Sequence, residues 1–165
     1  METIAVYWEP KIKTYGFQDA FDLSLLEFGF QSGRLQEWGS GIQEMGDLGV
    51  SFELVLVHYE GKKGLRVYLL FKRKWEEKLI KHVGQVIRRD EGETFRITSP
   101  VELISFFGPH FGDRYGIADS AFRALSLKAI PILAVGCSGS AIYLVLPEGM
   151  AQEAKALLAE TFEMP

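Results

Sequence analysis

The chain has 165 residues, of which 47% are hydrophobic and 24% charged, the balance of an ordinary globular protein. Its formal net charge of −4 argues against a nucleic-acid surface, which needs clustered positive charge to neutralise phosphates. No apolar run approaches the roughly 18–20 residues that span a bilayer, and the N-terminus does not resemble a signal peptide. The single cysteine fits a reducing compartment. We therefore expect a cytoplasmic protein with no nucleic-acid or membrane partner.

The first thirty residues are rich in strand-favouring patterns. Residues 3–8 and 11–15 predict two short strands, and residues 21–30 a longer one. The segment from Gly29 to Gly33 is then a bend, and Ser32 is a candidate helix N-cap. A helix should follow, because Leu35, Trp38, Ile42 and Met45 recur at helical spacing.

The middle of the chain repeats the strand and helix signals. Residues 50–59 and 65–71 predict two strands joined by a turn at Glu60–Gly64, which is typical of a hairpin. A second amphipathic helix is indicated by Trp75, Leu79, Val83 and Val86, and residues 94–98 suggest a short strand. Residues 21–98 therefore predict the order β-α-β-β-α-β.

The last third shows most of the same order again. Residues 101–107 predict a strand, and a Gly-rich bend from Gly108 to Gly116 leads into a helix. The stripe of that helix comprises Ile117, Ala118, Ala121, Phe122 and Leu125. Strands at 130–135 and 141–146 flank a turn at 136–140, and a final helix runs to about Phe162. This is a ferredoxin-like unit that lacks only its last strand.

The second unit resembles a known family. The residues that carry the likeness are Gly108, Asp113-Arg-Tyr-Gly-Ile-Ala118, Ala121-Phe-Arg-Ala-Leu125, Ala129-Ile-Pro-Ile-Leu-Ala-Val135 and Ser138-Gly-Ser140. They are similar to the ACT domains at the regulatory end of aspartate kinases, with their Pro-Gly-Val-Ala helix start, Phe-x-Ala-Leu helix core and Ser-rich hairpin. The chain departs from that pattern at Tyr115 (usually Pro), Pro131 (usually Asn), Cys137 (often Gln) and Ala141 (often Glu).

The resemblance implies an α+β fold of two ferredoxin-like (βαββαβ) ACT domains in tandem, without the kinase catalytic domain. In such regions the second domain begins with a strand ahead of the first domain. We therefore expect one domain over residues 18–98 and another over residues 1–17 and 99–165, with the N-terminal strand at residues 3–8 completing the second sheet.

Little in the sequence points to catalysis. The three histidines, His58, His82 and His110, lie in different elements without metal-ligand spacing. Cys137 lies in a turn with no basic residue near it in sequence, so we interpret it as a structural turn residue. No nucleophile elbow, Walker loop or kinase loop set is present. We expect no enzyme activity, cofactor or metal.

The two bends are the candidate binding sites. In ACT domains an amino acid or similar effector usually lies between the loop after the first strand and the second strand of a neighbouring domain. The resemblance thus implicates His110, Asp113, Arg114, Tyr115, Gly116 and Ile117 in one domain, and Gln31, Ser32, Gly33 and Ser51 in the other. Asp113 suits an ammonium group, whereas Pro131 lacks an N–H that Ser51 keeps. Alternatively, both bends only reverse the chain, with Asp113 and Ser32 as caps.

The strands of the second unit are apolar on both faces, which predicts a further covering partner, either the first unit or a second chain; we expect a homodimer.

The leading hypothesis is a regulatory or sensor protein that binds a small effector, an amino acid for preference. The alternatives are a ligand-free dimerisation module, a ferredoxin-like hydrolase and an RNA-binding sheet. An acylphosphatase-like hydrolase needs an Asn that this chain lacks, and the acidic balance disfavours RNA.

Overall fold

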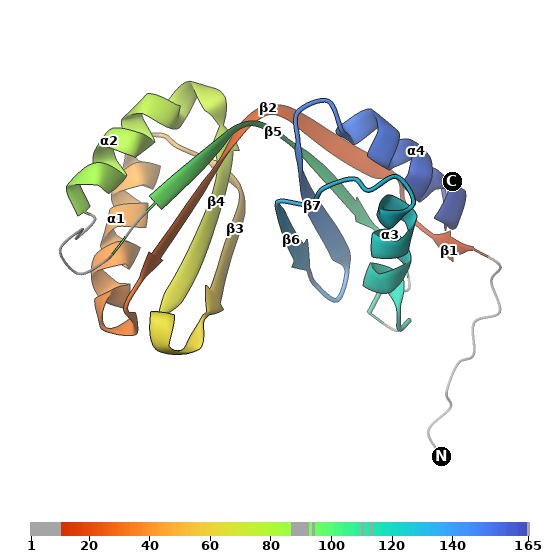
Figure 1. Ribbon diagram of the computed structural model, residues 1–165, viewed down its shortest axis with the longest axis horizontal. Coiled ribbons are helices and arrows are strands. Elements are labelled where there is room, and N and C mark those ends of the chain that lie inside the picture. The colour runs from red at the N-terminus through yellow and green to blue at the C-terminus, as the bar shows by residue number, and fades with distance from the viewer. Residues whose placement is uncertain (1–10, 87–92, 94, 110, 113, 165) are drawn as a thin grey trace, which may run out of the picture. The chain divides into compact units, whose positions relative to one another are not determined.

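The computed structural model describes residues 11–86, 93, 95–109, 111–112 and 114–164 (Figure 1). Contacts between residues divide the chain into two compact units. One, the first unit, is Ala20–Glu102; the other, the second unit, combines the chain up to Asp19 with the chain from Leu103 onward. From the sequence, the first domain was expected to comprise residues 18–98 and the second to comprise residues 1–17 and 99–165. Among the described residues, no helix combines the length and apolar character that a membrane crossing requires.

In the part of the first unit that the structure describes there are two α-helices and four strands. Strand β2 (Phe17–Phe30) begins in the second unit and continues into the first, where the 3-10 turn η1 (Ser32–Arg34) leads into α1 (Leu35–Asp47). The hairpin of β3 (Phe52–Tyr59) and β4 (Leu65–Lys72) encloses the short turn η2 (Gly61–Lys63). The turn η3 (Arg73–Trp75) precedes α2 (Glu76–Val86), and β5 (Phe95–Phe107) leads back into the second unit.

The core of the first unit lies between its sheet and its two helices. Alternation along the strands directs one side chain in two toward the helices, and the buried set is Leu26, Phe28, Phe30, Val67, Leu69 and Phe71. The helices contribute Trp38, Met45, Leu79 and Val83. The Trp38 ring stacks on Phe28 and Phe30, with ring centroids 4.3 and 5.3 Å away. Rings packed in this way add stability beyond their buried area.

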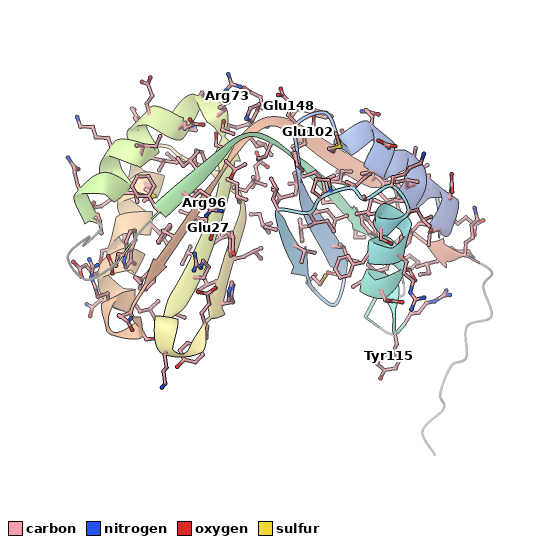
Figure 2. The ribbon with its side chains drawn as sticks, viewed as in Figure 1. Glu27, Arg73, Arg96, Glu102, Tyr115 and Glu148 are labelled. Carbon is pink, nitrogen blue, oxygen red and sulfur yellow. The ribbon has the colours of Figure 1, made fainter. Side chains whose placement is uncertain are left out.

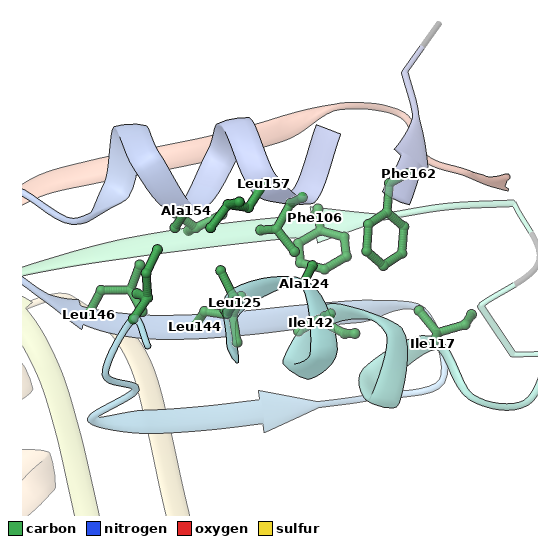
Figure 3. Packing of buried hydrophobic residues seen from close by; sticks show 14 of the residues in the cluster. Phe106, Ile117, Ala124, Leu125, Ile142, Leu144, Leu146, Ala154, Leu157 and Phe162 are labelled. Atoms are coloured by element: carbon green, nitrogen blue, oxygen red, sulfur yellow. The ribbon is translucent and has the colours of Figure 1, made fainter. Parts of the chain in front are cut away.

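The second unit contains α3 (Ile117–Ser126), β6 (Ala134–Cys137), β7 (Ala141–Pro147) and α4 (Ala151–Thr161). Figure 3 shows side chains from both helices meeting those of β5 and β7, among them Leu125, Ala154, Phe106 and Leu144. Phe106 is fully buried and contacts Phe17, Phe111 and Phe162, with ring centroids 5.0–5.9 Å apart. This aromatic group joins the start of β2 to the end of α4.

The six long strands form one sheet in the order β3-β4-β2-β5-β7-β6. β2 and β5 are neighbours in that order, and each belongs partly to both units. The antiparallel pairs β2–β4, β3–β4 and β6–β7, with two helices in each unit, make the molecule α+β. The order β3-β4-β2-β5 is the strand order of a ferredoxin-like sheet.

The N-terminal region can be compared with the expectation only from residue 11 onward. Residues 3–8 lie outside the described part of the chain, so their pairing stays a prediction. The next segment forms β1 (Ile12–Lys13), which pairs in parallel with β8 (Phe162–Glu163) in a separate two-stranded sheet. The strands beside β5 are β2 and β7, and β2 starts at Phe17 directly after the turn at Gly16 (φ 115°). Because Gln18 and Asp19 are polar, the first residues of β2 do not show the hydrophobic alternation from which a strand is predicted.

Three further boundaries were wrong. The strands expected at 94–98 and 101–107 are one strand, β5, which continues through Pro100. The strand expected at 130–135 begins at Ala134, because Ile130 is buried in the core directly after α3 and Pro131 has no N–H to donate. Ser32 is not an N-cap: it opens η1, and α1 begins after Arg34 without a side-chain cap.

Candidate functional site

The loop from Gly108 to Gly116 is anchored at its root. Gly108 lies so close to the Lys13 carbonyl and the Phe111 ring that a Cβ atom there would overlap both. Phe111 is 8% exposed and packs edge-on against Phe106, with ring centroids 5.9 Å apart. The start of the loop is therefore packed against the core of the second unit.

The loop ends in a left-handed residue that starts a helix. Gly116 is the N-cap of α3 with φ 82°, a conformation that costs side-chain-bearing residues free energy. Its carbonyl accepts hydrogen bonds from the Ser120 amide and the Ser120 hydroxyl, both at 2.9 Å. Among the described residues, no side chain donates or accepts a capping hydrogen bond at this helix start. The first-turn amides, at the positive end of the helix dipole, are therefore available to an anionic group.

A pocket of about 230 Å³ lies at this helix start. It is lined by Phe111, Arg114, Tyr115, Gly116, Ile117, Ala118, Cys137, Ser138 and Ile142. Phe111, Ile117 and Ile142 belong to the core cluster and give an apolar wall. Arg114 supplies a cation and Ser138 a hydroxyl. The combination suits a small molecule with one anionic group and one apolar group.

The wall opposite the loop is the tip of the β6–β7 hairpin. The Ser138 hydroxyl accepts hydrogen bonds from the amides of Ala141 (3.0 Å) and Ser140 (3.3 Å), so its position is fixed by the turn. Burial raises the pKa of the Cys137 thiol above its usual value, which keeps the thiol protonated at neutral pH. Cys137 therefore contributes a neutral surface to the pocket and not a nucleophile.

Tyr115 stands apart from the other lining residues. It is 100% exposed, and Figure 2 shows its ring extending away from the second unit. A large aromatic side chain with no packing in the free chain is available to cover a ligand or to meet a partner.

The structure brings part of the predicted set together. Arg114, Tyr115, Gly116 and Ile117 line the pocket, whereas His110 and Asp113 lie outside the described residues. Ile130 and Pro131, at the expected start of the second strand of this unit, do not line this pocket: Ile130 is buried in the core and Pro131 is exposed.

The turn of the β6–β7 hairpin forms the wall of the pocket opposite the loop. Sequence reasoning missed Phe111, Ala118, Cys137, Ser138 and Ile142 as lining residues. The Ser-rich turn between two strands was the signal that could have found two of them.

The corresponding bend of the first unit is organised differently. Gln31, Ser32, Gly33 and Ser51 are all exposed. The cation beside them, Arg34, is only 8% exposed and donates to Glu37 (2.8 Å), to Glu93 and to the Val86 carbonyl (3.0 Å). The hydrogen bond to Glu37, opposed by burial, raises the pKa of the Arg34 guanidinium. Because its three nitrogens already have partners, Arg34 holds the bend in place and is not available to a ligand.

Another pocket, of about 220 Å³, is lined by Lys13, Thr14, Tyr15, Pro109, Glu163 and Met164. It lies beside the β1–β8 pair and contains charges of both signs but no helix start. Its lining offers less selective chemistry than the pocket at Gly116, so we do not take it as the site.

The described histidines have structural contacts. His58 is half exposed, with its Nε2 3.3 Å from Glu60. His82, on α2, is 15% exposed and its Nε2 lies 3.5 Å from Glu44 on α1. Among the residues that the structure covers, no group of three His, Cys, Asp or Glu side chains could hold a metal ion.

Comparison with known proteins gives a result at the level of structure only. No family model matches the sequence, and no curated protein is significantly similar to it. Solved structures are similar over most of the chain. The regulatory subunit of aspartate kinase from Thermus flavus superposes with a TM-score of 0.78 at 12% identity, covering 90% of this chain and 98% of that one. The ligand-free regulatory subunit from Thermus thermophilus gives 0.76 at 14% identity, covering 91% and 99%.

The structure of a whole aspartate kinase is similar to this chain over only part of the kinase's length. The aspartate kinase from Synechocystis superposes with a TM-score of 0.81 at 13% identity, over 93% of this chain but 27% of the kinase. The chain therefore has the ACT-like fold of the regulatory regions of aspartate kinases, and these matches do not include a kinase catalytic domain. This confirms the resemblance inferred from its second half. At such low identity the likeness establishes the fold and leaves the ligand open.

Proposed function

We propose that this chain is a non-catalytic regulatory module, built from two tandem ACT domains, that binds a small effector in the pocket at the start of α3. An amino acid is the simplest effector that fits. The observation that carries the proposal is the pocket itself, in which the start of α3, Arg114 and the fixed Ser138 hydroxyl surround an apolar wall. The aspartate kinase regulatory subunits to which the chain is similar support a regulatory role.

The chemistry of the pocket assigns a role to each group. The effector's carboxylate accepts hydrogen bonds from the first-turn amides of α3 and from Arg114, where charge-assisted bonds are strong. Its side chain lies against Phe111, Ile117 and Ile142, which are already desolvated. In this proposal the protein is cytoplasmic, needs no cofactor and transmits occupancy of the pocket through association as a homodimer.

The test is a thermal-shift screen of the purified chain against the common amino acids, followed by calorimetry with each one that raises the melting temperature. Replacing Arg114 with Ala should weaken binding of such an amino acid about ten- to hundredfold, since one charge-assisted hydrogen bond is worth roughly 1.5–3 kcal/mol. The matched control is Arg123→Ala. Arg123 is 80% exposed on α3 and pairs with Asp119 at 2.8 Å, so this variant makes the same change in net charge outside the pocket.

Three results separate the possibilities. A screen in which no amino acid shifts the melting temperature contradicts an amino acid effector. Binding that survives in folded Arg114→Ala places the effector elsewhere, and the exposed bend at Gln31–Gly33 with Ser51 becomes the next site to test. Equal losses in the Arg114 and Arg123 variants would indicate a long-range charge effect rather than a contact.

A further inference from the structure

The apolar wall of the pocket at the start of α3 restricts which ligand side chain can lie against it. Phe111, Ile117 and Ile142 line the pocket and are 8%, 6% and 3% exposed. Their side chains offer no hydrogen-bond partner, so a charged or strongly polar group placed against them would lose its hydration without replacement. An apolar group would instead gain free energy by leaving water.

The remaining described lining residues strengthen this preference. Ala118 contributes a methyl group, and the Cys137 thiol is neutral because burial raises its pKa. Arg114 is the one charged side chain among the described lining residues. Its guanidinium can pair with the carboxylate of an amino acid, but it repels a cationic side chain.

Tyr115 is the lining residue that can change its position when a ligand binds. It is 100% exposed, and its ring extends away from the second unit (Figure 2). Exposed side chains change rotamer within picoseconds to nanoseconds, so the ring can turn onto a molecule in the pocket without movement of the core. Contact with an apolar ligand side chain would bury surface that the ring exposes in the free chain.

We propose that the effector of this pocket is an amino acid with an apolar side chain, and that Tyr115 selects it by covering that side chain. This rests on the proposed function, because it concerns the same pocket. The volume of about 230 Å³ is below the roughly 300–1,000 Å³ of pockets for larger ligands, which limits the effector to about the size of one amino acid. The class comprises leucine, isoleucine, valine, methionine and phenylalanine.

The first test compares leucine, alanine and lysine by calorimetry with the parent chain. Leucine should bind at least about tenfold more tightly than alanine, because a single methylene in an apolar pocket already changes discrimination by about 10–200-fold. Lysine is also long but cationic, and it should bind at least about tenfold more weakly than leucine, since its ammonium group meets the apolar wall and Arg114.

The second test removes the Tyr115 ring. Tyr115→Ala should weaken leucine binding about tenfold, which corresponds to about 1.4 kcal/mol or roughly 55 Å² of apolar surface. Alanine binding should change less than about twofold, because its methyl group is too short to reach the ring. Tyr115→Phe should bind leucine like the parent, since the contact is made by the ring and not by the hydroxyl.

The matched control is Tyr59→Ala, which makes the same substitution at a tyrosine that is 69% exposed on β3 and does not line the pocket. This variant should bind leucine like the parent. Because Tyr115 is fully exposed, its replacement should leave the fold intact, which thermal melts of all three variants check.

The outcomes separate this inference from the proposed function. Leucine binding that is unchanged in Tyr115→Ala overturns the selecting role of Tyr115 while effector binding stands. A parent chain that binds alanine or lysine as tightly as leucine overturns the apolar class. If no amino acid binds, or if leucine binding survives in Arg114→Ala, the proposed site fails as well.

Discussion

At the scale of single residues, Gly116 shows how backbone conformation constrains the candidate site. Its φ of 82° lies in the left-handed region, yet a Cβ built on it meets no atom within 4 Å. The cost of a substitution is therefore conformational rather than steric. Replacing Gly116 with Ala should lower the free energy of unfolding by about 1–2 kcal/mol, or roughly 2–4 °C in melting temperature per kcal/mol in a chain of this size.

The matched control for that prediction is Gly33→Ala. A Cβ at Gly33 also meets open space, and its φ lies outside the left-handed region, so the change should be neutral or slightly stabilising. Thermal melts of the two variants provide the measurement. Equal stability of both would mean that the helix start at Gly116 does not hold its left-handed conformation in solution.

At the scale of elements, the Arg34 cluster joins the start of α1 to the end of α2. Arg34 bonds Glu37 on α1, the carbonyl of Val86 at the last residue of α2, and Glu93, which is 5% exposed. Removing one member of a buried ion pair leaves a charge away from water without its partner. Arg34→Ala should therefore cost about 3–5 kcal/mol of stability.

An exposed ion pair in the same chain is the comparison for Arg34. Arg123→Ala removes an exposed i,i+4 pair and should change stability by only about 0.3–0.5 kcal/mol. Denaturant unfolding of the parent and of both variants measures the difference. If the two substitutions lower the free energy of unfolding equally, the Arg34 ion pairs are solvated in solution and do not stabilise the contact between α1 and α2.

At the scale of the whole molecule, formation of a dimer should make the melting temperature depend on protein concentration. For a dimer that unfolds to monomers, the melting temperature rises with protein concentration. With an unfolding enthalpy of roughly 0.7 kcal/mol per residue near 60 °C, a tenfold increase in concentration should raise it by about 2 °C. A parent chain whose melting temperature is constant over a hundredfold concentration range would argue against a dimer.

The sequence by itself determined the element types and the family of the fold. Periodicity at Leu35, Trp38 and Met45 identified α1, and the Gly-rich bend leading into Ile117 identified the loop that forms the pocket. These signals are local: a helix stripe, a hairpin turn and a left-handed glycine depend on neighbours a few residues away. The second half also carried enough motif to indicate an ACT-like fold before any comparison of structures.

Only the tertiary structure decided the features that depend on residues far apart in the chain. The pairing of β1 with β8 joins residues about 150 positions apart, and nothing near Ile12 could indicate Phe162. β5 continues through Pro100 because the strands beside it hold it extended, whereas a local pattern predicts a break. Cys137 and Ser138 became part of the candidate site only when the hairpin packed against the loop. Burial of Arg34 excluded it as a ligand contact, because burial is set by packing and not by residue type.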